Sequence, residues 1–231
     1  MIHAYSWRTS NGRKLHIMLE ETGLAYELHP IDIRKGDQFT PAFLKISPNN
    51  KIPAIVDDEP IGGGAPLSIF ESGAILTYLA EKTGKFLPTD ARGRYTVLQW
   101  VFWQVGGFGP ILGQAHHFID YAPAGSDYAK TRFIKDAGRL YGVLNRRLGE
   151  SEYLGGPEYT IADIITFPWS QGYAKHGQKI EDFPNVKRWQ DKILARPAVQ
   201  KGINLLRDLP ETPMDDKARS IMFGDAQYQR R

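Results

Sequence analysis

One stretch in the first quarter of the chain restricts the fold more than any other feature. Residues 47–57 read SPNNKIPAIVD, which places an Ile-Pro pair directly before an apolar strand. Proline has no N–H and a fixed φ, and an X-Pro bond is the only peptide bond that adopts cis at low cost. A cis Ile52-Pro53 bond would hold Ile52 in a bend, with its N–H and C=O directed out of the sheet. We therefore expect an edge on which an extended peptide can lie, as in strand addition.

The second half of this pattern follows a glycine-rich turn. Residues 67–75 read LSIFESGAI, which predicts a second strand that leads into Glu71 and Ser72 at the start of a helix. Free N–H groups at a helix N-terminus favour a carboxylate. The triple glycine at 62–64 precedes neither a Lys-Ser/Thr pair nor a helix, so we interpret it as a loop and not as a phosphate site.

The composition limits the possible chemistry. The 231 residues include no cysteine, which excludes a disulfide framework, a thiolate metal site and a protein thiol nucleophile. Any thiol chemistry must therefore use a thiol that a ligand brings. The net charge of +3 does not favour nucleic acid as the main partner. No apolar run approaches the ~20 residues of a membrane span, and the N-terminus predicts a strand instead of a signal peptide, so we expect a cytoplasmic protein.

Hydrophobic periodicity predicts an α/β part followed by an all-α part. Residues 2–7 and 26–33 are expected to be strands on either side of a helix, which gives a βαβ unit with a parallel pair. A short helix from Thr40, strands at 54–57 and 67–70, and a helix over 72–83 complete this part.

The rest of the chain shows no strand pattern. Helices are expected over residues 91–119, 127–149, 160–175, 184–195 and 197–207, the first of them bent or broken by the glycines and proline at 106–110. Thr160 and Asp163 form a capping box that starts a helix. The predicted organisation is a domain over 1–84, a linker over 85–90, a helical domain over 91–207 and an irregular C-terminal tail over 208–231.

These segments resemble the cytosolic glutathione transferase superfamily. The resemblance runs from residue 1 to about residue 207, and it rests on TSNG at 9–12, ISPNNKIPAI at 46–55, and the stretch from LQW at 98–100 to GQAHHF at 113–118. Within the superfamily these segments are closest to the nu class, the bacterial glutathione-dependent disulfide reductases. The resemblance implies a thioredoxin-like glutathione-binding domain, a C-terminal helical bundle domain and a homodimer.

The same resemblance implies that glutathione is a co-substrate and not a tightly bound cofactor. Glutathione carries one thiol, two carboxylates and one amine. Ser72 would bind the γ-glutamyl carboxylate and Glu71 the amine. Ile52, positioned by Pro53, would pair its backbone with the cysteinyl unit.

Further contacts are expected at the ends of the tripeptide. Gln38 and Lys51 are predicted to reach these ends. Arg132, early in a helix of the second part, matches an arginine that in the resembling family reaches across a dimer interface to glutathione.

Thiol activation is expected between the first strand and the first helix. Nu-class resemblance implies Thr9 and Asn11 next to the sulfur, and Ser10 stands where the family has a proline, which makes it a rival donor. Hydroxyl and amide donors there, together with the helix dipole, favour a thiolate. Other transferase classes use an N-terminal Tyr or Ser; we expect Tyr5 to pack within the sheet, and Ser6 is a weaker candidate.

The second substrate is expected against the helical part. Candidate contacts are Trp100, Phe102, Trp103, Phe108, His116 and His117. The histidine pair has no acidic or cysteine partner at ligand spacing in this interpretation, so no metal site is predicted.

The sequence favours a glutathione-dependent disulfide-bond reductase that acts on a small-molecule or peptide disulfide. Two alternatives stay open. One is a conventional transferase that conjugates glutathione to apolar electrophiles. The other is a non-catalytic protein that uses the same fold for binding or regulation.

Overall fold

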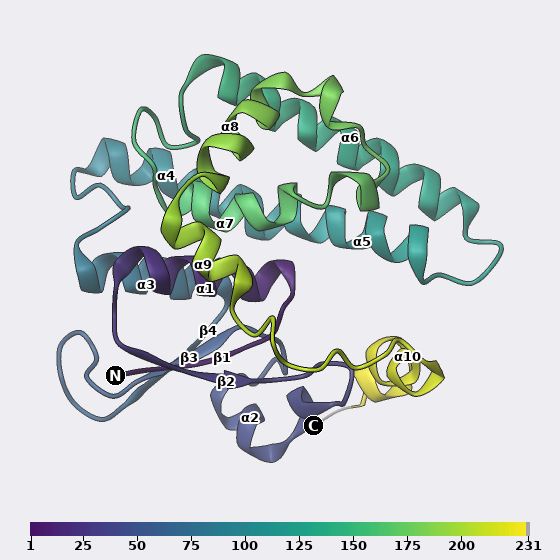
Figure 1. Cartoon of the computed structure of the whole chain (residues 1–231), viewed down its shortest axis with the longest axis horizontal. Coiled ribbons are helices and arrows are strands. Elements are labelled where there is room, and N and C mark those ends of the chain that lie inside the picture. Colours follow the sequence, from purple (N-terminus) through teal and green to yellow (C-terminus); the bar gives the residue numbers. More distant parts are fainter. Residues whose placement is uncertain (230–231) are drawn as a thin grey trace. The chain divides into compact units, whose positions relative to one another are not determined.

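The computed structural model describes residues 1–229 and begins with a four-stranded sheet (Figure 1). The strands are β1 (Ile2–Ser6), β2 (Tyr26–Pro30), β3 (Ala54–Asp57) and β4 (Leu67–Phe70), in the order β2-β1-β3-β4. β1 pairs with β2 in parallel, and β3 is antiparallel to both of its neighbours. The predicted βαβ unit is therefore confirmed.

Helices cover both faces of this sheet. In β1, Ile2, Ala4 and Ser6 are buried and alternate with half-exposed residues, so this strand turns one face toward a core. α1 (Ser10–Thr22) lies on one face and α2 (Pro41–Ile46) on the other (Figure 1). Gly23 ends α1 in the left-handed conformation at φ 72°, which a residue without a Cβ adopts readily.

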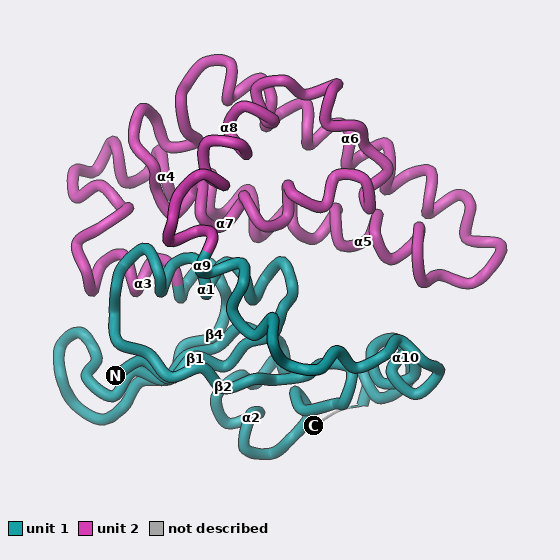
Figure 2. The backbone as a smooth tube through the Cα atoms, in the orientation of Figure 1, with its two compact units in different colours: residues 1–75, 201–231 teal, residues 76–200 magenta. Residues whose placement is uncertain are grey.

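The chain forms two compact units (Figure 2). Residues 1–75 and 201–231 make up the first unit, and residues 76–200 the second. The boundary falls within α3 (Ser72–Thr83), whose observed bounds are those predicted. The domain limits expected from the sequence follow helix ends instead, and they stay a prediction.

Within residues 76–200 the regular elements are helices. They are α4 (Ala91–Trp103), α5 (Gly109–Asp120), α6 (Asp127–Glu150), α7 (Ile161–Ser170) and α8 (Pro184–Leu194), followed by α9 (Pro197–Asn204), which enters the first unit. The predicted order of an α/β part and an all-α part is confirmed. The helix predicted over 160–175 ends earlier, at Ser170, and a short 3₁₀ turn at Tyr173–His176 follows it.

The glycine-rich segment between α4 and α5 does not break the helix. Residues Gln104–Phe108 form a π-helical turn, and the chain continues directly into α5 with Pro110 in its first turn. The Gly109 N–H donates to the Gln104 carbonyl five residues earlier, so backbone hydrogen bonding continues through the turn. The segment was expected to be bent or broken, and the structure shows a π-helical turn without a break.

The predicted tail is partly helical, which corrects the expectation of an irregular segment. α10 (Asp216–Phe223) begins at Asp215, whose carboxylate accepts a hydrogen bond from the Ala218 N–H at 2.8 Å. Residues 230–231 of the tail lie outside the described residues. In the part of the chain that the structure describes, no helix has the length and apolar character needed to cross a membrane.

A buried carboxylate organises the second unit. Asp163 is fully buried, and it accepts hydrogen bonds from the N–H of Leu154, the N–H and hydroxyl of Thr160, and the indole N–H of Trp189, at 2.8 to 3.2 Å. Burial raises the pKa of Asp163 to about 6, while these hydrogen bonds oppose the shift. The predicted capping box is confirmed, and it also ties α7 to α8 through Trp189.

We expect Asp163→Asn to lower the free energy of unfolding by about 3 kcal/mol, because an amide offers one acceptor oxygen to four donors and loses two charge-assisted hydrogen bonds. Urea denaturation at pH 7 measures the change. Asp191→Asn is the matched control, since its ion pair with Lys187 lies on the surface, where solvent screens it and its contribution to stability is small. Equal effects of the two substitutions would contradict the structural role of Asp163.

Candidate functional site

The register of three strands brings distant segments of the first unit to one end of the sheet, where β1 and β4 end and β3 begins. Tyr5 is paired with Ala54, and Ala54 is paired with Phe70. β1 and β4 end at this level, whereas β3 begins there. Thr9, Ile52 and Glu71, each a few residues from a strand end, are therefore brought to the same end of the sheet.

Thr9 is the N-cap of α1. Its hydroxyl oxygen accepts a hydrogen bond from the Gly12 N–H at 3.1 Å, so its own proton remains available for donation. Gly12 fits closely here: an added Cβ would lie 1.9 Å from the Trp7 carbonyl oxygen. A glycine is required at this point for α1 to begin so close to the end of β1.

The other predicted sulfur donors occupy the first turn of the same helix. Ser10 and Asn11 are half-exposed and are the first two residues of α1. The N–H groups of this turn point out of the N-terminal end of the helix, where the positive end of the helix dipole lies. The arrangement favours a negative charge such as a thiolate.

Two further N-terminal residues that the sequence raised lie elsewhere. The Tyr5 ring stacks on His29, with centroids 4.6 Å apart, and it also contacts Phe43. The Ser6 hydroxyl is buried beneath α1, where an added Cβ on Gly12 would be 2.6 Å from it. Tyr5 therefore packs against the sheet as expected.

The Ile52-Pro53 bond is cis. Pro53 is buried, and the loop before it is held by the Ser47 hydroxyl, which donates to the Lys51 carbonyl at 2.8 Å. Within residues 1–229 the Ile52 N–H and C=O make no hydrogen bond. Both groups can therefore pair with an extended ligand backbone.

Glu71 has an unusual backbone conformation. Its φ is +72°, in the left-handed region that a non-glycine residue adopts at a cost of about 1 kcal/mol or more. Its carbonyl accepts from the Ile75 N–H at 2.9 Å, so it stands directly before α3. The Glu71 side chain is exposed, whereas Ser72 is buried in the first turn of α3.

A lysine that the sequence analysis missed lies behind Ser72. Lys14 is only 2% exposed, and its Nζ donates to the Ser72 hydroxyl oxygen at 3.2 Å. Burial lowers the pKa of Lys14 to about 7, while the charge of Glu71 opposes the shift. A buried cation at the start of α3 adds to the attraction of this helix end for a carboxylate. The available signal was that Lys14 shares a face of α1 with the apolar residues Ile17 and Met18, one turn further along.

The two residues expected at the ends of the ligand lie in different environments. Gln38 is buried, with its amide nitrogen on the Ile33 carbonyl at 3.2 Å. Its side-chain oxygen is buried and has no hydrogen-bond partner among the described residues. Lys51 stands next to Ile52, and its Nζ donates to the side-chain oxygen of Gln227 at 2.8 Å.

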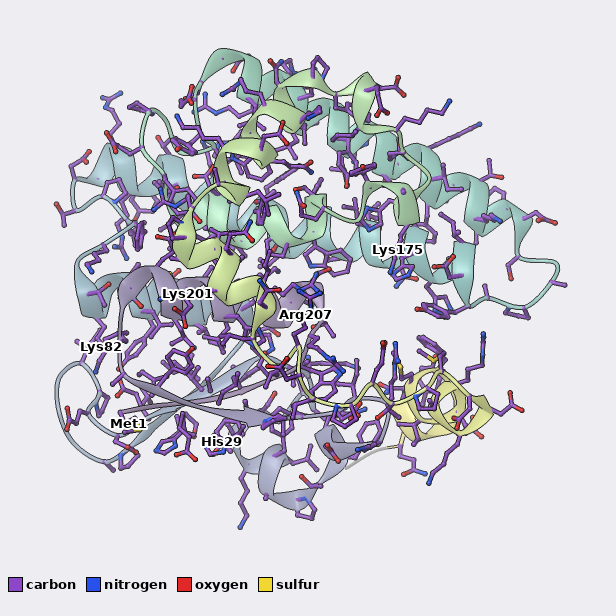
Figure 3. All side chains as sticks on the ribbon, viewed as in Figure 1. Met1, His29, Lys82, Lys175, Lys201 and Arg207 are labelled. Atoms are coloured by element: carbon purple, nitrogen blue, oxygen red, sulfur yellow. The ribbon has the colours of Figure 1, made fainter. Side chains whose placement is uncertain are left out.

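The C-terminal tail therefore reaches the site. Arg8 donates to the carbonyls of Arg207, labelled in Figure 3, and of Pro210, both at 3.3 Å. Further along the tail, Glu211 forms an ion pair with Arg34 at 3.0 Å. The tail thus follows the segments that carry Thr9 and Lys51. No pattern in the sequence indicated this path, because the contacts join residues some 180 positions apart.

The residues of the second unit that were expected to contact a substrate divide into core and surface residues. Trp103 stacks on Phe108 at 4.8 Å, and Phe108 is fully buried, so these rings are core. Phe102 is 67% exposed on α4, and Arg132 is exposed on α6. Trp100 packs edge-on against Trp103 and lies beneath the Arg147 guanidinium.

The histidine pair differs from expectation in one respect. His116 Nε2 lies 3.0 Å from a carboxylate oxygen of Asp120, one helical turn further along α5. The expectation that the pair has no acidic partner was therefore wrong, because an i,i+4 spacing brings the two side chains together. Burial lowers the pKa of both His116 and His117.

Comparisons with known proteins agree with the fold. Residues 1–81 match the model of the glutathione S-transferase N-terminal domain, and residues 126–197 match that of the C-terminal domain. The disulfide-bond oxidoreductase YfcG of Escherichia coli is 52% identical over 203 residues, which are 88% of this chain and 94% of the relative.

Two solved structures are also similar. A glutathione transferase from Burkholderia graminis, with two glutathione molecules bound per subunit, is 45% identical with a TM-score of 0.83, over 90% of this chain and 89% of the other. A glutathione transferase from Pseudomonas putida, with one glutathione disulfide bound per subunit, is 42% identical with a TM-score of 0.83, over 89% and 91% of the two chains.

Proposed function

The chain belongs to the glutathione S-transferase family and is an enzyme, and on that premise we propose that it is a nu-class glutathione-dependent disulfide-bond reductase. The observation that carries the proposal is a site with thiolate-stabilising donors in a chain without cysteine. Both thiols of the reaction must then come from glutathione. The names of the similar proteins, a disulfide-bond oxidoreductase and a transferase that holds two glutathione molecules, support this choice.

In this proposal glutathione lies along the sheet edge formed by residues 1–84. Its γ-glutamyl carboxylate binds Ser72, its amine binds Glu71, and its cysteinyl backbone pairs with Ile52. Gln38 and Lys51 contact the ends of the tripeptide. The Thr9 hydroxyl donates to the sulfur, with Ser10 and Asn11 as the rival donors.

The reaction uses two glutathione molecules. The first thiolate attacks one sulfur of the substrate disulfide, forms a mixed disulfide and releases one substrate thiolate. The second thiolate attacks the glutathione sulfur of the mixed disulfide, which releases the other substrate thiolate and leaves oxidised glutathione. Two electrons pass to the substrate, and the two glutathione protons end on its thiols.

Placement of the two sulfurs contributes more than activation of the thiol. A thiol of pKa ~8.5 is ~3% thiolate at pH 7, and lowering its pKa by ~2 units raises that fraction ~25-fold. Nucleophilicity falls ~8-fold over the same change, so the net gain is only ~3-fold. Holding the thiolate in line with the disulfide accounts for the larger part of the acceleration.

Glutathione is reduced in the cytosol, which is where such a reductase would find its co-substrate. We also infer a homodimer. Tyr95 and Phe102 on α4 are 69% and 67% exposed, and Leu67 and Phe70 on β4 are 41% and 37% exposed. Tyr95 and Phe102 are seven residues apart and therefore share one face of α4, and apolar side chains gathered on one face are typical of a surface that a second subunit covers.

Three predictions test this proposal, and the first of them concerns the reaction. With glutathione and hydroxyethyl disulfide, coupled to glutathione reductase, we expect disulfide turnover well above conjugation of a chlorinated aromatic acceptor. Thr9→Ala is expected to lower kcat/KM by about 10- to 100-fold, because the lost hydrogen bond would hold the sulfur in line as well as favour its charged form. The ultraviolet absorbance of bound thiolate should show a raised thiol pKa in this variant.

Control variants distinguish the loss of the proposed hydrogen bond to sulfur from the loss of the helix cap. Thr9→Ser keeps the hydroxyl and should keep the activity, whereas Thr40→Ala removes an equivalent cap from α2 and should leave turnover unchanged. Ser10→Ala and Asn11→Ala rank the rival donors. Conjugation above disulfide turnover would make the chain a conventional transferase. Absence of both activities with glutathione still bound would favour a binding protein.

A second prediction concerns pH. We expect the affinity for S-methylglutathione, which has no free thiol, to fall as pH rises above about 7, the pKa of Lys14. The bound carboxylate favours the ammonium form of Lys14. Above the pKa of free Lys14, binding must therefore take up a proton, and the favourable charge interaction contributes less to affinity as pH rises. Lys14→Met should remove this pH dependence and weaken binding about 10-fold at pH 6.5. Calorimetric titration from pH 6 to 8.5 measures the affinity and its pH dependence, with a substitution of the exposed Lys45, Lys45→Met, as control. If the pH dependence is unchanged in Lys14→Met, Lys14 does not contribute to carboxylate binding.

A third prediction concerns Arg132. If its guanidinium reaches the glutathione of the partner subunit, a heterodimer of Arg132→Ala and Thr9→Ala subunits contains one intact site. Combining the two impaired variants in equal amounts should then give about one quarter of wild-type turnover above their residual rates, because half of the dimers are mixed and each has one of two sites intact. Differently tagged, co-expressed subunits allow the measurement. No gain over the separate variants would mean that Arg132 does not act across an interface.

A further inference from the structure

The first two strands bring two histidines and a glutamate together on one face of the sheet. His3 is paired with Glu27, and Tyr5 with His29, across the parallel strands β1 and β2. Residues two apart on a strand share a face, and paired residues lie side by side, so these four side chains form one group. His29 is labelled in Figure 3, as is Met1 at the start of β1.

The donor atoms of this group have the spacing of metal ligands. His3 Nδ1 lies 3.1 Å from His29 Nε2 and 3.4 Å from a Glu27 carboxylate oxygen. The other Glu27 oxygen lies 3.9 Å from His29 Nε2. Ligands at ~2.0 to 2.1 Å from a tetrahedral zinc ion are about 3.3 Å from one another. One Glu27 oxygen and the two imidazole nitrogens all lie within 4.8 Å of one another, so a rotation of the exposed Glu27 side chain can bring the three atoms to that geometry.

Neighbouring groups hold the two imidazoles in the required orientation. His3 Nε2 lies 3.1 Å from a carboxylate oxygen of Asp58, and a proton on Nε2 donated to that oxygen would leave the Nδ1 lone pair for a metal ion. A carboxylate behind a histidine in this way is common in zinc sites, where it fixes the ring and raises its basicity. The His29 ring is stacked on Tyr5 at 4.6 Å and 17°.

We propose that His3, Glu27 and His29 bind one Zn²⁺ ion, with water in the fourth position. Two imidazoles and one carboxylate suit zinc better than magnesium or calcium, which prefer oxygen ligands alone. Glu27 and Asp58 together balance the charge of the ion. The three side chains are 27%, 58% and 32% exposed, so the ion exchanges directly with solvent.

This site is distinct from the glutathione site. His3 lies in the first half of β1, whereas Thr9 follows the other end of the strand. The bound ion would link β1 to β2 and, through Asp58, to the turn after β3. No metal site was predicted from the sequence, because the two histidines are 26 residues apart and only the strand register brings them together.

Calorimetric titration of metal-free protein with ZnCl₂ alone, in the absence of glutathione, tests the proposal. We expect one saturable site per subunit and a higher Tm with zinc. His29→Gln and Glu27→Gln should each weaken binding at least about tenfold, while Glu59→Gln, on the neighbouring turn, should not. Co²⁺ in place of Zn²⁺ should give the intense visible absorption of a tetrahedral site, and His29→Gln should abolish it.

The result is independent of the proposed reaction. His29→Gln should retain wild-type disulfide turnover, and loss of turnover in Thr9→Ala should leave zinc binding unchanged. The proposal is overturned if the protein shows no saturable zinc binding. It is also overturned if both ligand substitutions leave binding unchanged, or if His116→Gln removes it instead, which would assign the ion to the histidine pair of α5.

Discussion

The alignment of Tyr5, Ala54 and Phe70 across three neighbouring strands is the constraint on which the site depends. It brings together a helix start, a loop with unpaired backbone groups and a glutamate at positive φ, although these three lie far apart in the sequence. Burial fixes this alignment. Ala4 and Ile55 are paired and fully buried, and a slip of one residue would turn one strand's apolar side chains toward solvent. The positions of the site residues are therefore a consequence of how the sheet buries its core.

Two residues at the site lower the stability of the fold. The folded pKa of Lys14 is about 7, far below the ordinary value for lysine. Between pH 7 and about 10 the unfolded chain binds a proton that the folded chain does not, so this group makes stability rise with pH and is least favourable at pH 7 and below. Glu71 adds the cost of a left-handed backbone in a residue with a Cβ. Both lie beside Ser72, where a bound carboxylate and amine would compensate for them, which is the pattern expected when residues are retained for binding.

The helix and strand bounds that were predicted correctly are set by residues within or next to each element. Strands at Ala54–Asp57 and Leu67–Phe70 and the helix over Ser72–Thr83 have the predicted bounds, because proline, glycine and capping residues delimit them. Features that depend on distant segments were missed. Burial of Lys14 follows from the position of α3, the approach of His3 to His29 follows from strand register, and the contact of Gln227 with Lys51 follows from the path of the tail. At Gln104–Phe108 the local glycine signals indicated a bend or a break, and the structure has a π-helical turn without a break.

The lack of cysteine shapes the site as much as the residues that are present. A protein thiol is positioned by its own backbone, whereas a ligand thiol has to be positioned through the rest of the ligand. The groups gathered at the sheet edge are suited to positioning a ligand in this way, since they comprise a backbone edge at Ile52, a buried hydroxyl backed by a cation at Ser72 and an exposed carboxylate at Glu71. In the proposed reaction only the start of α1 would act on the sulfur itself, and the net gain from lowering a thiol pKa is small. We therefore propose that most of the residues at this edge hold an extended peptide in register, and that the chemistry follows from where its sulfur is held.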